Sequence, residues 1–97
     1  MHSISFVWDE RKAETNLNKH KIAFDEATTV FSDPNARMIF DPDHSSDEDR
    51  FIILGLSSTL RILVVCHCYL EDGMVIRINS ARKGNKYEQK QYESFIS

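Results

Sequence analysis

Long apolar runs, a basic start and internal repeats are all missing from this sequence, and each absence excludes a class of protein. No stretch of the 97 residues approaches the roughly 18–20 consecutive apolar side chains that a membrane-spanning helix needs. Residues 1–8 lack the charged start and the apolar stretch of a secretory signal peptide, so we expect a cytoplasmic protein. Without repeats, low-complexity segments or linkers, residues 1–97 are expected to form a single domain.

Cysteine is scarce, and the two cysteines present are not placed to form a stabilising disulfide. Cys66 and Cys68 stand two apart on an expected strand, so they point the same way and are poorly placed to form a disulfide with each other. Cys66-His67-Cys68 resembles a metal-binding motif. However, His67 points to the strand face opposite the two cysteines, and no second cysteine pair completes a zinc site. We therefore interpret both cysteines as small buried side chains.

An excess of positive charge is also missing, since the net charge is −3. Taken alone, this balance argues against a nucleic-acid partner. The charges are unevenly distributed, however. Residues 25–49 carry eight acidic side chains and one arginine, whereas residues 73–97 carry five basic and two acidic side chains. A basic end on an acidic protein can still hold a phosphate backbone locally.

Hydropathy patterns predict a strand, two helices, four strands and a last helix. Alternating apolar side chains predict a strand over 4–8, and a helix over 10–19 follows with Asp9 as its N-cap and Ala13 and Leu17 on its apolar face. A second helix over 25–31, capped by Asp25, ends at Asp33-Pro34. Further strands are expected over 37–40, 51–56, 61–69 and 75–79, with a final helix over 86–95.

This order of elements predicts an α+β fold. Hairpin connections, including the turn signal Asp72-Gly73, favour an antiparallel sheet. Segregated helices and strands favour two N-terminal helices packed on one sheet face, with the C-terminal helix added at the end. The other face then stays at least partly open and can carry function.

Cationic side chains gather where the last strand ends and the last helix begins. They are Arg77, Arg82, Lys83 and Lys86. A guanidinium group suits phosphate because its donors form a rigid fork that stays charged. Glu88 and Tyr92 lie four apart on one side of the final helix, and His67 stands on the neighbouring strand.

This inventory matches the needs of a ribonuclease that works without metal. Such an enzyme needs a base for the 2′-hydroxyl, a cation for the phosphate and an acid for the leaving oxygen. His67 or Glu88 could be the base, and Arg77 and Arg82 could hold the phosphate. Tyr92, Lys83 or His67 could assist the leaving group. A structural histidine and a solvated basic helix face are the alternatives that the residues alone leave open.

Motifs spaced along nearly the whole chain resemble those of the BrnT toxin family. The first part matches F-x-W-D-x-x-K-x-x-x-N-x-x-K-H followed by F-x-E-A, at Phe6 to Ala27. The middle matches at Asp41-Pro42, His44, Arg50, Gly55, Leu63-Val64-Val65 and His67. The end resembles R-I-I-S-A-R-(R/K) followed by E-x-x-x-Y, at Arg77 to Lys83, Glu88 and Tyr92. Many matches in order are more specific than any one motif.

The resemblance implies a RelE-like fold and the toxin of a type II toxin–antitoxin system. Such a toxin is an RNA endonuclease that inhibits translation and growth, uses the 2′-hydroxyl as nucleophile and needs no metal or other cofactor. A BrnA-like ribbon-helix-helix antitoxin neutralises it and brings the pair to operator DNA. The resemblance places the active region at Arg77, Arg82, Lys83, Glu88 and Tyr92, with His67 nearby, and makes Lys12, Lys19, His20 and Lys86 candidates for RNA binding.

Two positions depart from the family pattern. Lys21 stands where a glycine usually follows Lys-His, and a left-handed backbone there would cost lysine roughly 1 kcal/mol. Asn79 stands where a second isoleucine is expected, which places a polar residue within a strand.

Two other classes of function compete with the ribonuclease. One is a binding module without catalysis that acts as co-repressor with a DNA-binding partner. The other is a metal-dependent hydrolase that uses Asp41, Asp43, His44 and His67. A chelator separates the second from the ribonuclease, and expression of the protein alone in cells separates the first.

Overall fold

The structure is a computed structural model and describes residues 4–40 and 49–96. Three helices, five strands and two short 3₁₀ turns occur in these ranges. In chain order they are β1 (Ser5–Val7), α1 (Glu10–His20), α2 (Phe24–Thr28), η1 (Thr29–Ser32), β2 (Arg37–Phe40), β3 (Phe51–Leu56), β4 (Ile62–Leu70), η3 (Glu71–Gly73), β5 (Val75–Lys83) and α3 (Lys86–Ile96). The predicted order of elements is confirmed.

The strands form one sheet in the order β1-β5-β4-β3-β2. Strands β2 to β5 pair antiparallel, as the hairpin signals predict. Strand β1 pairs parallel with β5, so the sheet is mixed and the prediction of a purely antiparallel sheet is wrong at this edge. No hairpin joins β1 to β5, because the helices and three strands lie between them in the chain, and the hairpin argument does not apply there.

Helix α1 begins and ends as its sequence predicts. The Asp9 carboxylate accepts hydrogen bonds from the N–H groups of Arg11 and Lys12, which confirms Asp9 as the N-cap. After the helix, Lys21 adopts a left-handed conformation with φ 62°, and its N–H bonds to the Leu17 carbonyl at 3.0 Å. The helix end therefore needs the conformation that glycine adopts most easily, and lysine occupies it here.

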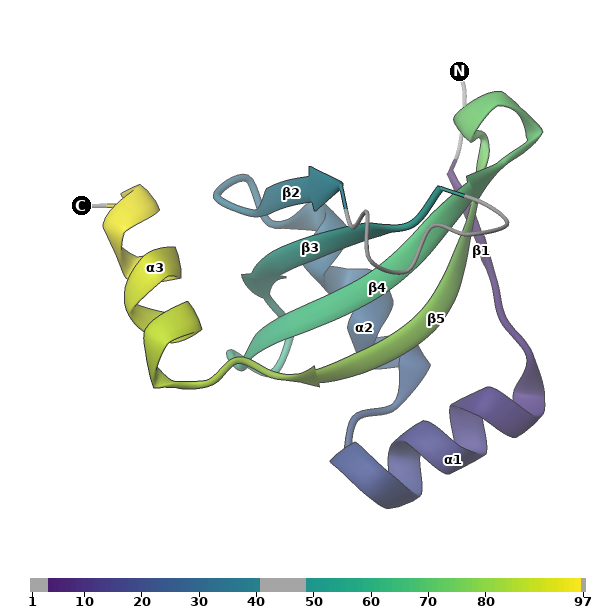
Figure 1. Cartoon of the computed structure of the whole chain (residues 1–97), viewed down its shortest axis with the longest axis horizontal. Coiled ribbons are helices and arrows are strands. Elements are labelled where there is room, and N and C mark those ends of the chain that lie inside the picture. The colour runs from purple at the N-terminus through teal and green to yellow at the C-terminus, as the bar shows by residue number, and fades with distance from the viewer. Residues whose placement is uncertain (1–3, 41–48, 97) are drawn as a thin grey trace.

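Two details of the helices differ from the prediction. Helix α2 starts after Ala23 and has no side-chain cap, so Asp25 is not its cap and lies in its first turn. Leu17 is 47% exposed, and the buried residue of α1 is Asn16. The reason is that α1 lies beside β5 (Figure 1), beyond the residues of that strand that pair with β1, and is turned so that Asn16 points to β5.

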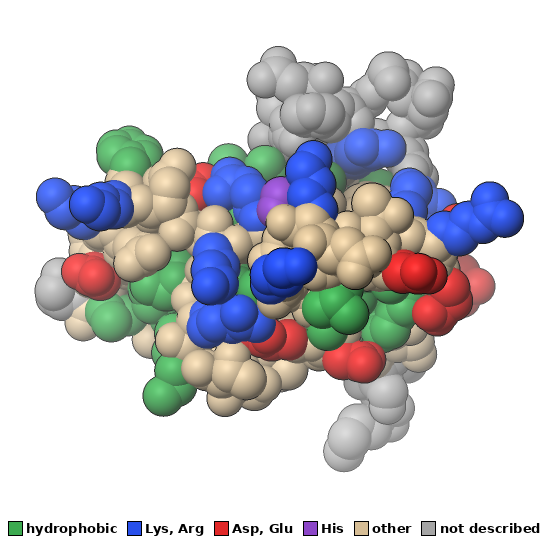
Figure 2. Space-filling view, turned by 90° about the horizontal axis from the view of Figure 1, so that it is seen from below, with side chains coloured by type: hydrophobic (Ala, Val, Ile, Leu, Met, Phe, Trp, Pro, Cys, Tyr) green, Lys and Arg blue, Asp and Glu red, His purple; other side chains and the backbone are tan. Residues whose placement is uncertain are grey.

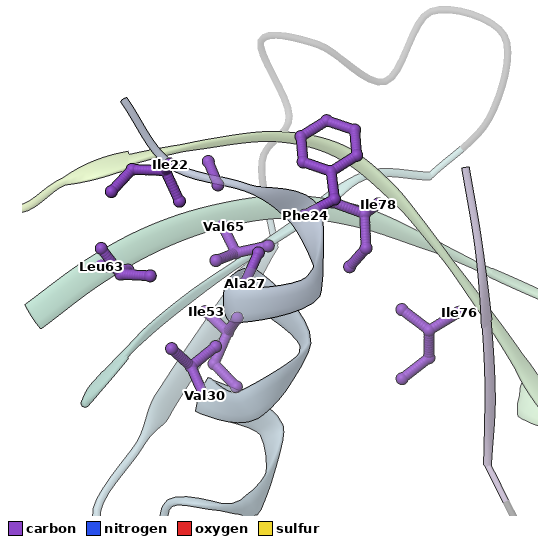
Figure 3. Packing of buried hydrophobic residues seen from close by; sticks show 10 residues of the cluster. Ile22, Phe24, Ala27, Val30, Ile53, Leu63, Val65, Ile76 and Ile78 are labelled. Atoms are coloured by element: carbon purple, nitrogen blue, oxygen red, sulfur yellow. The ribbon is translucent and has the colours of Figure 1, made fainter. Parts of the chain in front are cut away.

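One face of the sheet is covered by α2 and η1 and forms the main core. Figure 3 shows apolar side chains of α2 meeting those of β3, β4 and β5. The fully or almost fully buried members are Ile22, Phe24, Ala27, Val30, Ile53, Leu63, Val65, Ile76, Ile78 and Ala81. Gly55 of β3 permits this close approach, because a Cβ there would lie 3.1–3.2 Å from the Cβ atoms of Ala36 and Val30. We call this side of the sheet the core face.

Polar contacts fix α2 to the hairpin between β3 and β4. The Glu26 carboxylate accepts hydrogen bonds from the Arg61 guanidinium, which also forms its salt bridge, and from Ser57 Oγ at 2.6 Å. The hydrogen bond from Arg61 lowers the pKa of Glu26 to about 2. Glu26 is therefore ionised at neutral pH and belongs to the scaffold.

The opposite face of the sheet is covered only in part, and we call it the open face. Helix α3 stands at the end of β5 (Figure 1) and packs Tyr92 against Leu54 and Val64. The Arg37 guanidinium lies 4.6 Å from the centre of the Phe95 ring and extends this contact to β2. In Figure 1 no described helix lies in front of the middle of β4 and β5.

A bulge in β5 decides which side chains reach the open face. Cys66 pairs with Ser80 but His67 pairs with Ile78, so Asn79 is the extra residue. Ile76 and Ile78 face the core before the bulge, and Ala81 does so after it. Strict alternation would have turned Arg82 toward the core. The bulge places Arg82 opposite Val64 on the open face instead.

The same bulge explains why β5 is longer than predicted. The polar residues Arg77, Asn79 and Ser80 were expected to end the strand near residue 79, yet β5 continues to Lys83. Polar side chains are compatible with a strand when they face solvent on an open face.

No helix in the described ranges is long and apolar enough to cross a membrane.

Candidate active site

A hollow of about 330 Å³ lies on the open face where α1 meets β3, β4 and β5. Figure 2 views the molecule from the side of α1 and shows Lys and Arg side chains gathered around a histidine. Four cationic or titratable side chains from three distant parts of the chain line the hollow, together with small and apolar ones. The lining is Lys12, His20, Arg50, Ile52, Val64, Cys66, Asn79, Ser80, Ala81 and Arg82.

Helix α1 supplies two of these groups from the same side. Lys12 and His20 are eight residues apart, which is close to two helical turns, so they share one face of the helix. His20 also ends the helix, where the partial negative charge of the helix terminus favours a cation. A shallower groove that also contains Lys19 adjoins the hollow, between α1 and residues 79–80 of β5. The three residues predicted to bind RNA on this helix therefore lie on one continuous surface.

Arg82 reaches the hollow as half of a fork-to-fork ion pair. Its Nη1 and Nη2 atoms donate to the two carboxylate oxygens of Glu88 at 2.8 and 2.9 Å. Its Nη1 atom also donates to the Lys83 carbonyl at 3.3 Å, and the arginine side chain stays 44% exposed. The pair brings together two of the predicted catalytic residues and fixes the plane of the guanidinium.

Glu88 is itself fixed by the start of α3. Its Oε1 atom accepts from the N–H of Asn85 at 2.9 Å, and the Asn85 side chain accepts from the N–H of Glu88 at 2.8 Å. This reciprocal arrangement is a capping box. The hydrogen bond from Arg82 lowers the pKa of Glu88. Because its oxygens already hold Arg82, Glu88 is better suited to orient that arginine than to accept a substrate proton.

His67 is not brought to the hollow. It is 0% exposed and lies on the core face, with its ring centre 4.8 Å from that of Phe31 and 5.3 Å from that of Tyr69. Its Nδ1 atom lies 3.2 Å from the Val65 carbonyl oxygen. Burial lowers the pKa of His67. The residue is a neutral core histidine, because strand alternation turns it away from Cys66 and Arg82.

Tyr92 is not brought to the hollow either. Its ring is 3% exposed beneath α3, and its hydroxyl donates to Asp33 Oδ2 at 2.6 Å. Burial and this carboxylate raise the pKa of Tyr92 to about 12. Glu88 and Tyr92 share one side of α3 as predicted, but Tyr92 is one turn further along the helix and ties it to the scaffold.

The other predicted residues do not line the hollow. Arg77 lies on the open face, where its Nη2 atom is 3.9 Å from Cys68 Sγ. Lys83 ends β5 and Lys86 begins α3, and both are exposed. Lys83 pairs with the core residue Leu63 and stands one position after Arg82, so its side chain points to the opposite side of the sheet from Arg82.

The sequence did not single out Arg50, Cys66 or Asn79 as parts of the site. Arg50 immediately precedes β3, which is separated from β5 by β4, and it lines the hollow on the side away from Arg82's strand. Cys66 is only half-buried, contrary to the prediction of two buried cysteines, whereas Cys68 is buried and accepts from Asn79 Nδ2 at 3.2 Å. The alternation in β4 was a usable signal for Cys66, since it faces away from the buried His67.

The metal-dependent hydrolase considered above would use four residues, and most of them lie outside the described ranges. Asp41, Asp43 and His44 are among them, and His67 sits in the core. Within residues 4–40 and 49–96, no group of three His, Cys, Asp or Glu side chains could hold a metal ion.

The fold and the hollow define a small RelE-like α+β protein with a cationic site on the open face of its sheet. A family model described as the ribonuclease toxin, BrnT, of type II toxin–antitoxin systems matches residues 8–88. The chain therefore belongs to the BrnT family, which confirms the resemblance read from its motifs. Membership in a type II family implies an RNA substrate and an antitoxin partner.

The fold is also that of a solved BrnT protein. The crystal structure of the Brucella abortus ribonuclease toxin, BrnT, superimposes with a TM-score of 0.63 at 22% sequence identity. The alignment covers 87% of this chain and 100% of that chain. No match was found among curated proteins. The match supports the α+β architecture described above, which agrees with the RelE-like fold that the family resemblance implies.

Proposed function

We propose that this protein is a metal-independent RNA endonuclease, the growth-inhibiting toxin of a toxin–antitoxin pair that acts in the cytoplasm. The observation that carries the proposal is the hollow, which Arg82, Arg50, Lys12 and His20 line together. Three fixed cations suit a phosphodiester, and histidine is the side chain best able to exchange a proton near neutral pH. Family membership supplies the substrate class.

The reaction that fits these groups is an internal transfer of the phosphate. His20 takes the proton of a ribose 2′-hydroxyl, and that oxygen attacks the adjacent phosphorus. The bond from phosphorus to the 5′-oxygen breaks, which leaves a 2′,3′-cyclic phosphate, and the departing oxygen takes a proton from the Lys12 ammonium. Arg82 and Arg50 stabilise the extra negative charge on the phosphoryl oxygens.

The other predicted residues take supporting roles in this proposal. Glu88 orients Arg82 and is not the base. Arg77, Lys86 and Lys19 hold neighbouring phosphates of the RNA chain on the surface around the hollow. Lys83 is left out of this surface, because it points to the other side of the sheet. His67 and Tyr92 are left out of the chemistry because both are buried away from the hollow.

The direct test is cleavage of an RNA oligonucleotide by the purified protein in EDTA. We expect cleavage by the native protein and a rate at least about a hundredfold lower for Arg82→Ala, since a preorganised phosphate ligand is lost. Lys90→Ala is the matched control, because it removes an exposed cation of α3 that does not line the hollow. Equal rates for Arg82→Ala and Lys90→Ala would remove the hollow as the active site, and loss of all cleavage in EDTA would contradict metal independence.

We also propose a BrnA-like ribbon-helix-helix antitoxin that neutralises the protein and carries it to operator DNA. The support is the type II family, in which a toxin is paired with an antitoxin. Expression of the toxin alone should stop growth, and co-expression with a BrnA-like ribbon-helix-helix protein encoded beside its gene should restore it. Unaffected growth and intact RNA would favour the competing role of a non-catalytic co-repressor.

A further inference from the structure

We propose that Asn16 is a positioning residue that sets Lys12 and His20 of α1 against Arg82 of β5. The inference rests on the proposed function, since it assigns the device that assembles the same site. Asn16 does not line the hollow; it lies at the floor of the adjoining groove with Lys19 and is only 6% exposed. It acts through the two α1 side chains that line the hollow.

The carboxamide of Asn16 makes the bonds that a neighbouring strand would make. Its Oδ1 atom accepts from the N–H of Ala81 at 3.0 Å, and its Nδ2 atom donates to the carbonyl of the same residue at 2.9 Å. In an antiparallel sheet, one residue exchanges both of its backbone bonds with its partner in this way. Strand β1 pairs with residues 75–77 of β5 only, so Asn16 takes over the edge further along.

The same amide also fixes the chain that leaves α1. Asn16 Nδ2 donates a second hydrogen bond, to the carbonyl of Ile22 at 2.9 Å. Ile22 is fully buried in the core, one residue after the left-handed Lys21. Both donor hydrogens and the acceptor oxygen of Asn16 are thereby used at a position that is 6% exposed. A buried polar group with every bond made specifies one arrangement and disfavours others.

Apolar packing alone does little to fix the position and rotation of α1 on the sheet. Its one long aliphatic residue, Leu17, is 47% exposed, and Ala13 is only partly buried against the core. Rotation of a helix by a single residue turns its side chains by about 100°. The amide clamp removes this freedom at the point where α1 contacts β5.

The position of the clamp relates directly to the site. Lys12 and His20 stand four residues before and four residues after Asn16, which places all three on one side of α1. The bonded strand residue, Ala81, immediately precedes Arg82. One amide thus joins the helix face that carries Lys12 and His20 to the strand residue beside the phosphate-binding arginine.

The test is a double-mutant cycle between Asn16 and His20, measured by cleavage of an RNA oligonucleotide. Asn16→Ala should lower kcat by about tenfold or more, because misplaced groups lose effective molarity. In a His20→Ala background, the same change should cost less than about threefold, because the two residues act as one unit. Asn16→Asp keeps the shape of the side chain but loses both N–H donors. Its effect on kcat should therefore resemble that of Asn16→Ala.

A matched control separates positioning from lost stability. Val30→Ala removes core volume beneath α2, far from the hollow, and lowers the melting temperature as well. At a temperature where every variant is folded, kcat of Val30→Ala should match the native value. Equal losses in the native and His20→Ala backgrounds, or a loss in Val30→Ala as large as in Asn16→Ala, would overturn the positioning role.

Binding of a non-cleavable 2′-deoxy oligonucleotide keeps this inference distinct from the proposed function. If the native protein binds it but cuts no RNA, the endonuclease proposal fails and the cycle is measured on affinity instead. The positioning role then predicts that the oligonucleotide shifts the His20 ring resonances in the native protein and that this shift is lost in Asn16→Ala. An unchanged shift in Asn16→Ala would overturn it.

Discussion

The two faces of the sheet receive neighbouring residues of one strand and use them in opposite ways. In β4, His67 points to the core face and is fully buried, whereas Cys66 on the next position points to the hollow. On the core face, burial lowers the pKa of His67, so the ring stays uncharged. On the open face, His20 stands among cations at the surface. The comparison teaches that the face, and not the residue type, decides which histidine can take part in chemistry.

Charged residues show the same contrast. Arg61, which holds α2 to the β3–β4 hairpin, donates to the Glu26 carboxylate. Glu26 also accepts hydrogen bonds from Ser57 and Thr59. Arg82 on the open face is held by Glu88 but remains 44% exposed. The first pair stabilises the fold, and the second presents an oriented cation to a ligand.

Replacement of the two histidines should separate function from stability most strongly. His20→Ala should lower the RNA cleavage rate by at least about a hundredfold, because a proton-transfer group is lost. Its unfolding free energy should change by no more than about 0.5 kcal/mol, as for other surface substitutions. Chemical denaturation and single-turnover cleavage measure the two effects. A fully active His20→Ala would break the contrast between the two faces.

His67→Ala should do the reverse. Removal of a buried ring that contacts Phe31 and Tyr69 should destabilise the fold by about 3 kcal/mol, through the cavity it leaves. Under conditions where the variant is folded, its cleavage rate should match the native rate. A folded but inactive His67→Ala would place chemistry on the core face and contradict the account.

The native protein should also show the titration of His67 in its stability. Because the folded pKa lies below the ordinary value near 6.5, the unfolded chain binds a proton that the folded chain resists. Stability should therefore decline as the pH falls through 6.5, and this decline should be absent in His67→Phe. Urea unfolding between pH 5 and pH 8 measures it, and an identical slope in His67→Phe would assign the decline elsewhere.

Glu26→Gln should weaken the scaffold by about 2 kcal/mol at pH 7, the usual worth of hydrogen bonds to a charged group. With a folded pKa of about 2 against an ordinary 4.5, Glu26 contributes stability that is present above pH 4.5 and lost as the pH falls toward 2. The variant should show a flatter acid limb in thermal melts and unchanged RNA cleavage. Reduced cleavage by folded Glu26→Gln would show that the scaffold pair also serves the hollow.

Lys21→Gly should have the smallest effect and the opposite sign. Lysine holds a backbone φ of 62° at the end of α1, and glycine there should stabilise the fold by up to about 1 kcal/mol. The Lys21 Nζ atom donates to the Asn18 carbonyl, so the gain is reduced by the loss of this bond. A melting temperature that falls in Lys21→Gly would contradict this reading of the helix end.

The sequence predicted the elements better than it predicted the site. Periodicity and turn signals placed every helix and strand, with Asp9 capping α1 as expected. These are local features, and local residues determine them. The parallel pairing of β1 with β5 is a contact between the two ends of the chain, and no local pattern encodes it.

The site depends on such distant contacts. Arg82 and Glu88 were predicted together because they are close in sequence, and they form an ion pair. His67 was predicted in the site because its strand pairs with β5, and Tyr92 because it lies four residues after Glu88, yet alternation and packing bury both. Lys12 and His20 line the same hollow as Arg82, and the bond that joins their helix to β5 runs from Asn16 to Ala81, 65 positions away in the sequence. The bulge at Asn79, which aims Arg82 at the hollow, had no signal beyond a polar residue in a strand.

The central claim is that the open face alone binds the nucleic acid. The most direct measurement is an NMR titration of the native protein with a non-cleavable 2′-deoxy RNA analogue, which reports the contact surface without requiring turnover. The account predicts shifts at the amides of residues 79–82 and at the His20 ring, while Val30 and Ile53 on the core face stay unchanged. Shifts centred on α2 and the β3–β4 hairpin, with a silent hollow, would contradict it.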